Sequence, residues 1–123
     1  MKIYYSQSFL VKIKSLTNTE QKLIGDFVTS LQKNGFTGLP GRNKASTGVS
    51  KNHANRIKLI QFAIANCLYH YHIGYKSYDT SKKFGDWTSE YVVHYTNKDN
   101  DSIKLVAYGA HPPFKLPKNA DLV

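Results

Sequence analysis

Three stretches in the second half of the chain alternate between two kinds of side chain with a period of two residues. This alternation is typical of β-strands, because successive side chains of a strand point to opposite faces. We therefore predict strands over Cys67–Tyr75, Tyr91–Tyr95 and Ser102–Tyr108. The polar stretch Lys76–Thr88 predicts a long loop between the first two strands, and residues 97–101 predict a turn between the last two.

The same alternation assigns the histidines to one face. In the first strand, His70 and His72 share a face, while Tyr69, Tyr71 and Ile73 share the other. We expect the more apolar faces of the three strands to align against a core. The opposite, solvent-facing side of the sheet would then collect His70, His72, His94, Lys104 and Tyr108.

Two helices are predicted before these strands. Thr17 and Glu20 have the spacing of a capping box, and Asn34-Gly35 is a typical helix end, so a helix is expected over Thr17–Lys33. Its apolar stripe has spacings of three and four residues and consists of Leu23, Ile24, Phe27, Val28 and Leu31. A second helix is the preferred prediction for Lys51–Asn66, where Ile57, Ile60 and Ile64 have helical spacing, with a strand through Ile57 and Leu59 as the alternative.

The remaining segments complete the predicted order of elements. Met1–Tyr5 reads as a short strand, Ser6–Leu16 fits no single element, and the glycines of Gly35–Ser50 predict a loop. Arg42, Lys44 and Lys51, at flexible positions of this loop, suit phosphate contact. A strand, two helices and three consecutive strands indicate an α+β fold, and residues 1–123 are expected to form one domain.

The charge of the chain indicates an anionic partner. The sequence has 17 Lys and Arg against 8 Asp and Glu, a formal net charge of +9, and no polybasic tail that would carry this excess. The positive field therefore belongs to the folded surface, which favours nucleic acid or an acidic protein over a membrane. The nine tyrosines suit both half-buried strands and stacking on bases.

Cysteine usage and hydropathy indicate where the protein acts. The single Cys67 cannot form an internal disulfide, so nothing suggests a secreted disulfide scaffold. The sequence has no apolar run of 18 residues and no signal peptide. We therefore expect a cytoplasmic protein without a membrane partner.

The C-terminal strands resemble the RelE/ParE superfamily of bacterial toxins. The elements that match are residues 67–72, 89–95 and 103–108, followed by Gly109-Ala110-His111 and the aromatic Phe114. The resemblance implies a small antiparallel sheet of about four strands packed on two N-terminal helices, in the order β-α-α-β-β-β. It also implies a toxin of a toxin–antitoxin system, with mRNA, the ribosome and a cognate antitoxin as partners.

The sequence departs from this superfamily in its cations. Many ribosome-dependent members carry an arginine on the middle strand of the C-terminal sheet, where this chain has Val92-Val93-His94, and no arginine follows Arg56. A histidine-centred mechanism would therefore have to replace one in which arginines hold the phosphate.

Histidines can perform the proton transfers of RNA cleavage. Attack by the 2′-OH on the phosphate needs a base and an acid, and the reference pKa of histidine, about 6.5, suits both. We expect His70 or His72 as the base and His111 or His94 as the acid. Arg56, Lys76 and Lys104 are candidate phosphate partners, and Tyr108 and Phe114 are candidates to stack on a base. The predicted endoribonuclease uses no metal or other cofactor.

Two other functions use the same residues. His70, His72 and His94 could bind zinc with a fourth position for water, although the basic face disfavours a dication. The protein could also bind without catalysis, as a nucleic-acid-binding protein or as a ParE-like toxin that targets a topoisomerase.

Overall fold

The structure is a computed structural model that describes residues 1–111 and 115–123. Phe114, one of the predicted stacking residues, lies outside the described residues. The elements follow in the order β1 (Lys2–Tyr5), α1 (Gln7–Lys14), α2 (Asn18–Asn34), β2 (Asn43–Ala45), α3 (Arg56–Ala65), β3 (Leu68–His72), β4 (Tyr91–Thr96), β5 (Ser102–Ala110) and the 3-10 helix η1 (Asn119–Leu122).

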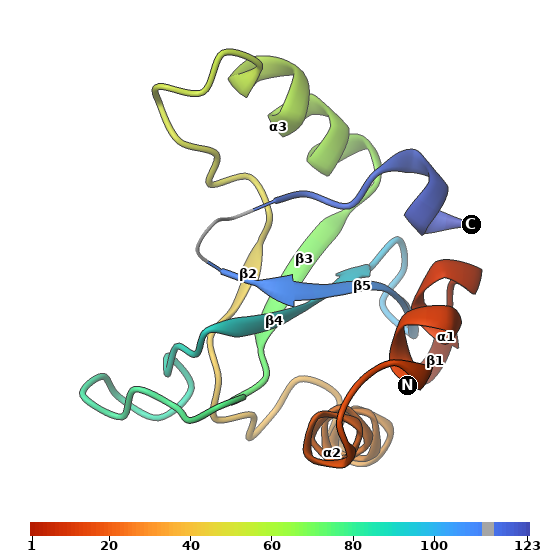
Figure 1. The fold of residues 1–123 in the computed structure, drawn as a ribbon, viewed down its shortest axis with the longest axis vertical. Helices are drawn as coiled ribbons and strands as arrows, with labels where there is room; N and C mark the ends of the chain where they lie inside the picture. Colours follow the sequence, from red (N-terminus) through yellow and green to blue (C-terminus); the bar gives the residue numbers. More distant parts are fainter. Residues whose placement is uncertain (112–114) are drawn as a thin grey trace.

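The described strands form one five-stranded mixed sheet in the order β1-β5-β4-β3-β2 (Figure 1). β1 pairs with β5 in parallel, and the other neighbours are antiparallel. The predicted α+β class is confirmed, but the sheet is neither four-stranded nor purely antiparallel. The missed strand, β2, has only three residues and lies in a glycine-rich segment, too short to show an alternating pattern.

Helix α2 begins and packs as its sequence predicts. The Thr17 hydroxyl accepts a hydrogen bond from the Glu20 main-chain N–H, and the Glu20 carboxylate accepts one from the Thr17 main-chain N–H. These two bonds complete the capping box. Its apolar stripe is buried against the tyrosine face of the sheet, where the ring of Phe27 stacks on Tyr71 at 4.4 Å between centroids. This contact makes the α2 side the main core of the protein.

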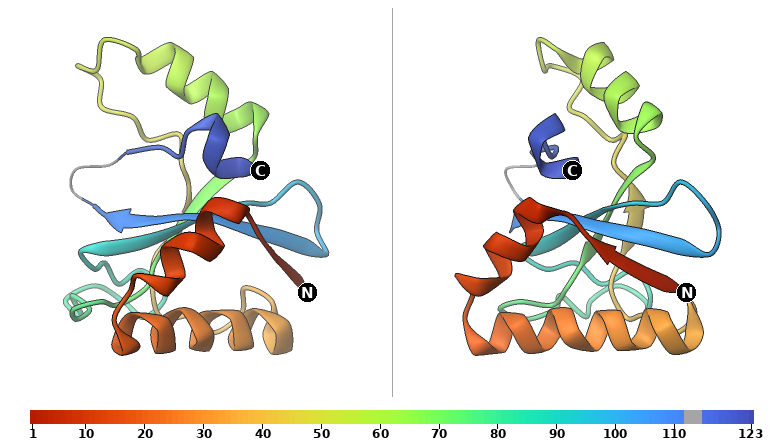
Figure 2. Two further views of the ribbon diagram at one scale, coloured as in Figure 1. Left: turned by 45° about the vertical axis from the view of Figure 1, so that its right-hand side comes forward. Right: turned by 90° about the vertical axis from the view of Figure 1, so that its right-hand side faces the viewer.

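The second predicted helix lies on the other side of the sheet. Figures 1 and 2 show α2 on one side and α3 on the opposite side, so the expectation of two helices packed together on one face is wrong. Ala63 of α3 packs with Leu68, Val106 and the C-terminal segment in a second, smaller core. The ambiguous region 6–16 contains α1, whose N-cap Ser6 accepts a hydrogen bond from the Phe9 main chain.

A β-bulge in β5 moves Tyr108 to the α2 side. Tyr95 lies opposite Leu105 but His94 lies opposite Ala107, so Val106 is an extra residue in β5. An extra residue shifts the alternation of every residue after it. The expectation that Tyr108 lies beside the histidines is therefore wrong: its side chain is buried in the main core, and its hydroxyl donates to the Glu20 carboxylate at 2.6 Å.

None of the described helices combines the length and the apolar character that crossing a bilayer requires.

Gly41 allows the chain before β2 to pass close to the end of β3. A Cβ atom at this position would collide with the main-chain oxygen of His72 and would lie 2.7 Å from the Tyr78 hydroxyl. The Gly41 N–H also donates to the Tyr71 hydroxyl at 3.2 Å. The close approach therefore positions the segment that carries His72.

We expect Gly41→Ala to destabilise the protein by about 1–3 kcal/mol, because the added methyl group must displace the backbone of β3. Urea denaturation measures the change. Gly48→Ala is the matched control, since a Cβ there meets no atom within 4 Å. Equal free energies of unfolding for the two variants would contradict the close approach.

Candidate functional site

Three histidines meet on the face of the sheet opposite α2. His70 and His72 project from β3, and His111 follows the end of β5. Their ring centroids are 5.8 Å apart for His70 and His72, 5.6 Å for His70 and His111, and 5.5 Å for His72 and His111. Each ring offers one nitrogen that lies within 4.8 Å of the others. We call these three residues the histidine cluster.

The pairing of β4 and β5 brings His111 to the cluster. Tyr91 at the start of β4 lies opposite Ala110, and Val92 lies opposite both His72 and Gly109 in the two ladders. The main-chain N–H of His111 then donates to the Glu90 oxygen at 2.6 Å, which continues the pairing by one residue. His111 therefore reaches the end of β3 although β4 lies between the two strands.

The histidine cluster lines an open pocket of about 690 Å³. One wall comes from β2, which supplies Lys44, and from Arg42 directly before it, and another comes from the loop between β3 and β4. The polar residues that share the pocket with the cluster are Arg42, Lys44, Ser77, Tyr78, Asp79, Thr88, Ser89 and Glu90. An anionic group of modest size could enter this pocket and contact imidazoles and cations together.

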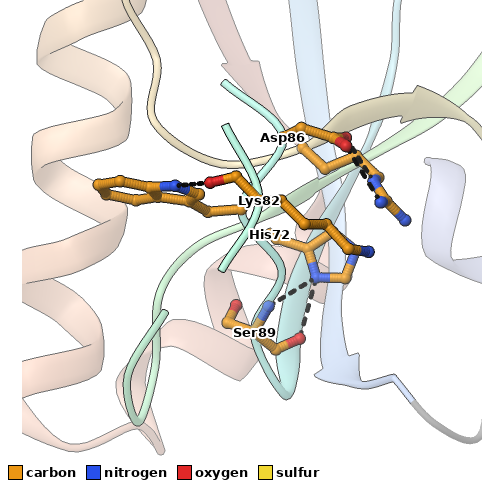
Figure 3. A network of polar contacts seen from close by, with 6 residues as sticks. His72, Lys82, Asp86 and Ser89 are labelled. Carbon is orange, nitrogen blue, oxygen red and sulfur yellow. Dashed lines mark hydrogen bonds and ion pairs between the residues drawn. The ribbon is translucent and has the colours of Figure 1, made fainter. Parts of the chain in front are cut away.

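The main chain of Ser89 orients the ring of His72. Nδ1 of His72 lies 2.9 Å from the Ser89 oxygen and 3.1 Å from the Ser89 nitrogen, and Figure 3 shows both atoms at the same ring nitrogen. The Ser89 oxygen can accept from a protonated Nδ1, and the Ser89 N–H can donate to an unprotonated one. Ser89 therefore holds the ring in either tautomer and makes Nε2 the reactive nitrogen.

A chain of hydroxyl groups fixes the backbone of His72. The Tyr78 hydroxyl donates to the His72 main-chain oxygen at 2.6 Å and lies 3.0 Å from the Tyr71 hydroxyl. The Tyr71 hydroxyl in turn accepts from Gly41. Because Tyr71 belongs to the main core, this chain connects the core to the pocket.

His70 is buried and is held by a serine. It is 5% exposed, and its Nδ1 shares a 2.9 Å hydrogen bond with the buried hydroxyl of Ser46. Burial, together with the neighbouring His94, His72 and His111, lowers the pKa of His70 to about 3. Burial also lowers the pKa of both His72 and His111. The three imidazoles are therefore neutral at pH 7 and can accept a proton.

His94 shares the face of the cluster but does not line its pocket. Its ring centroid is 6.1 Å from that of His70, and its side chain is buried beside Leu116 and Pro117 of the C-terminal segment. Burial lowers its pKa to about 4. The sequence predicted these histidines on a solvent-facing surface, but α3 and the C-terminal segment cover that side of the sheet, so His94 is enclosed.

The three cations predicted to hold the phosphate beside the histidines do not line the pocket. Arg56 lies at the start of α3, where its Nε donates to the Val49 oxygen at 3.4 Å. Lys76 pairs with Glu90 at 3.8 Å, and Lys104 lies beside β1 in a different depression. Among the described residues, the cations lining the pocket are Arg42 and Lys44.

Arg42 is held by an ion pair. Its Nε lies 2.7 Å and its Nη2 3.3 Å from the two oxygens of Asp86. Figure 3 marks the contacts of Asp86 with dashed lines. The hydrogen bond to Asp86 raises the pKa of Arg42. Asp86 belongs to the loop between β3 and β4, so this pair joins two walls of the pocket.

Sequence reasoning missed several residues of the pocket. Ser46, Ser89 and Tyr78 act through hydrogen bonds to a histidine ring or to its backbone. Such contacts depend on how distant segments meet and leave no periodic signal in the sequence. The loop position of Arg42 and Lys44 did suggest phosphate contact, but the missed strand β2 hid their proximity to the histidines.

Comparisons of the chain with models of known protein families, with curated proteins and with solved structures found no match.

The buried histidines make the fold sensitive to acid. The unfolded chain binds a proton at His70 and His94 near pH 6.5, whereas the folded protein resists protonation down to about pH 3 and pH 4. The contribution of these two histidines to the free energy of unfolding is therefore fully present above pH 6.5 and falls as the pH decreases toward 4. Each linked histidine contributes a slope of about 1.4 kcal/mol per pH unit in this window.

We expect His94→Asn to reduce the slope of unfolding free energy against pH by about 1.4 kcal/mol per pH unit between pH 6 and 5, because asparagine does not titrate. Urea denaturation at several pH values measures the slope. A His94→Asn variant with the wild-type slope would show that His94 is not the acid-sensitive group.

Proposed function

We propose that the protein is an endoribonuclease toxin that cuts mRNA and that the pocket of the histidine cluster is its active site. The observation that supports this proposal most directly is the convergence of His70, His72 and His111 in a pocket with Arg42 and Lys44. Cleavage by the 2′-OH requires proton transfer at two oxygens and positive charge near one phosphate. This pocket contains groups for each requirement.

In the proposed reaction, His72 is the base and His111 is the acid. Nε2 of His72 removes the proton from the 2′-OH, and the 2′-oxygen then attacks phosphorus to form a 2′,3′-cyclic phosphate. The bond from phosphorus to the 5′-oxygen breaks, and His111 gives its proton to that oxygen. Both residues line the pocket, whereas His94 does not.

The phosphate of the substrate would favour the protonated form of His111. His111 is neutral at pH 7 in the free protein, because burial and the nearby Arg42 lower its pKa. A phosphate beside the ring favours the imidazolium form and raises that pKa. Lys44, and Arg42 from its place beside Asp86, then stabilise the phosphate in the transition state.

The toxin assignment comes from the resemblance to the RelE/ParE superfamily and from the net charge of +9. The basic surface suits mRNA on the ribosome and an acidic antitoxin that covers it. These partners place the protein in the cytoplasm. The observed α+β fold is compatible with this assignment, although its mixed five-stranded sheet differs from the antiparallel sheet implied by the resemblance.

We expect the purified protein to cut mRNA on translating ribosomes in the presence of EDTA and to leave 2′,3′-cyclic phosphate and 5′-hydroxyl ends. His72→Ala and His111→Ala should each reduce the cleavage rate by about 100- to 10,000-fold, the usual contribution of a positioned acid or base. Sequencing of the cut ends and gel analysis measure both the position and the rate of cleavage.

His53→Ala is the matched control, because His53 is exposed and lies outside the pocket. Circular dichroism and RNA binding at several salt concentrations show whether each variant still folds and binds. Unchanged cleavage by His72→Ala would refute the assigned base. Tight RNA or topoisomerase binding with no cleavage product would instead favour a non-catalytic toxin.

A further inference from the structure

We propose that His70, His72 and His111 form a binding site for one Zn²⁺ ion, with a fourth coordination position open to the pocket. The sequence pointed to His94 as the third ligand of such a site. The structure replaces it with His111, because the ring nitrogens of His70, His72 and His111 lie together and His94 does not line the pocket. The zinc site uses the pocket of the proposed function but does not require RNA cleavage.

The three imidazoles are close to the geometry that zinc needs. Their candidate ligand nitrogens lie within 4.8 Å of one another. With Zn–N bonds of about 2.0–2.1 Å in a tetrahedral arrangement, ligand nitrogens are about 3.3 Å apart. Rotation of the rings and a shift of His111, which follows the end of β5, would close the difference.

The hydrogen bonds behind the rings resemble those behind metal ligands. Histidines that bind zinc through one nitrogen usually hold the other nitrogen by a hydrogen bond to a main-chain oxygen or a polar side chain. His72 has this arrangement with the Ser89 oxygen at 2.9 Å, and His70 has it with the Ser46 hydroxyl at 2.9 Å. In both residues, Nε2 is therefore the ligand atom of the proposed site.

The local charge of the pocket permits a dication despite the basic surface. Two cations line the pocket, Arg42 and Lys44, and two carboxylates line it with them, Asp79 and Glu90. Asp86 additionally pairs with Arg42 at 2.7 Å. Among the described residues, the charged side chains that line the pocket therefore have a formal sum of zero, in contrast to the net charge of +9 for the whole chain.

Zinc bound to the cluster would block the proposed nuclease. A bound Zn²⁺ occupies the nitrogen lone pairs through which His72 and His111 would transfer protons. Zinc is therefore expected to inhibit RNA cleavage in the pocket and to be displaced by chelators. A water molecule or a phosphate oxygen could fill the fourth position.

The test is titration of the chelator-treated, dialysed protein with Zn²⁺ by isothermal calorimetry, followed by titration with Co²⁺ and its visible absorption spectrum. We expect saturable binding of about one ion per chain and a cobalt spectrum of tetrahedral type. His72→Ala and His111→Gln should abolish this binding, and His53→Ala should retain it. His111→Gln changes a half-buried residue, so it keeps the test valid if His72→Ala fails to fold.

The absence of saturable binding, or its persistence at wild-type affinity in the folded His111→Gln variant, would overturn the zinc site. The same preparations separate this proposal from the proposed function. Zinc binding without any RNA cleavage supports the site and rejects the nuclease. RNA cleavage in EDTA without saturable zinc binding supports the nuclease and rejects the zinc site.

Discussion

The strand β3 places apolar side chains in the main core on one face and histidines in the pocket on the other, and the rest of the structure depends on this arrangement. Its tyrosines pack against α2 in the main core, while its histidines face the opposite side. Because the side chains of a strand alternate, a shift of one residue would exchange the two sets and bury imidazoles under Phe27. The pairing of β3 with β4 at His70 and His94 excludes that shift and determines where the pocket forms.

Features with a local physical cause could be predicted from the sequence. The capping box of Thr17 and Glu20 and the apolar stripe that follows predicted α2 almost to its ends. Strict alternation predicted β3 and the shared face of His70 and His72. In these cases the neighbouring residues alone determine the conformation, so no knowledge of distant contacts was needed.

Features that arise from contacts between distant segments could not be predicted. The extra residue Val106 shifts the alternation of β5, and so Tyr108 joins the main core instead of the histidines. The parallel pairing of β1 with β5 joins two ends of the chain, and the short β2 shows no periodic pattern. The sequence therefore predicted that His70 and His72 lie together, but not that Arg42, Lys44 and the supporting serines lie beside them.

Hydrogen bonds from Tyr71 through Tyr78 to the backbone of His72 connect the main core to the pocket. The ring of Phe27 stacks on that of Tyr71. A displacement of α2 would therefore shift Tyr71 and, through the Tyr78 hydroxyl, the backbone of His72. A substitution on the buried stripe of α2 can therefore misalign the imidazoles while the protein remains folded. Selection on pocket geometry would then extend to residues that never touch a ligand.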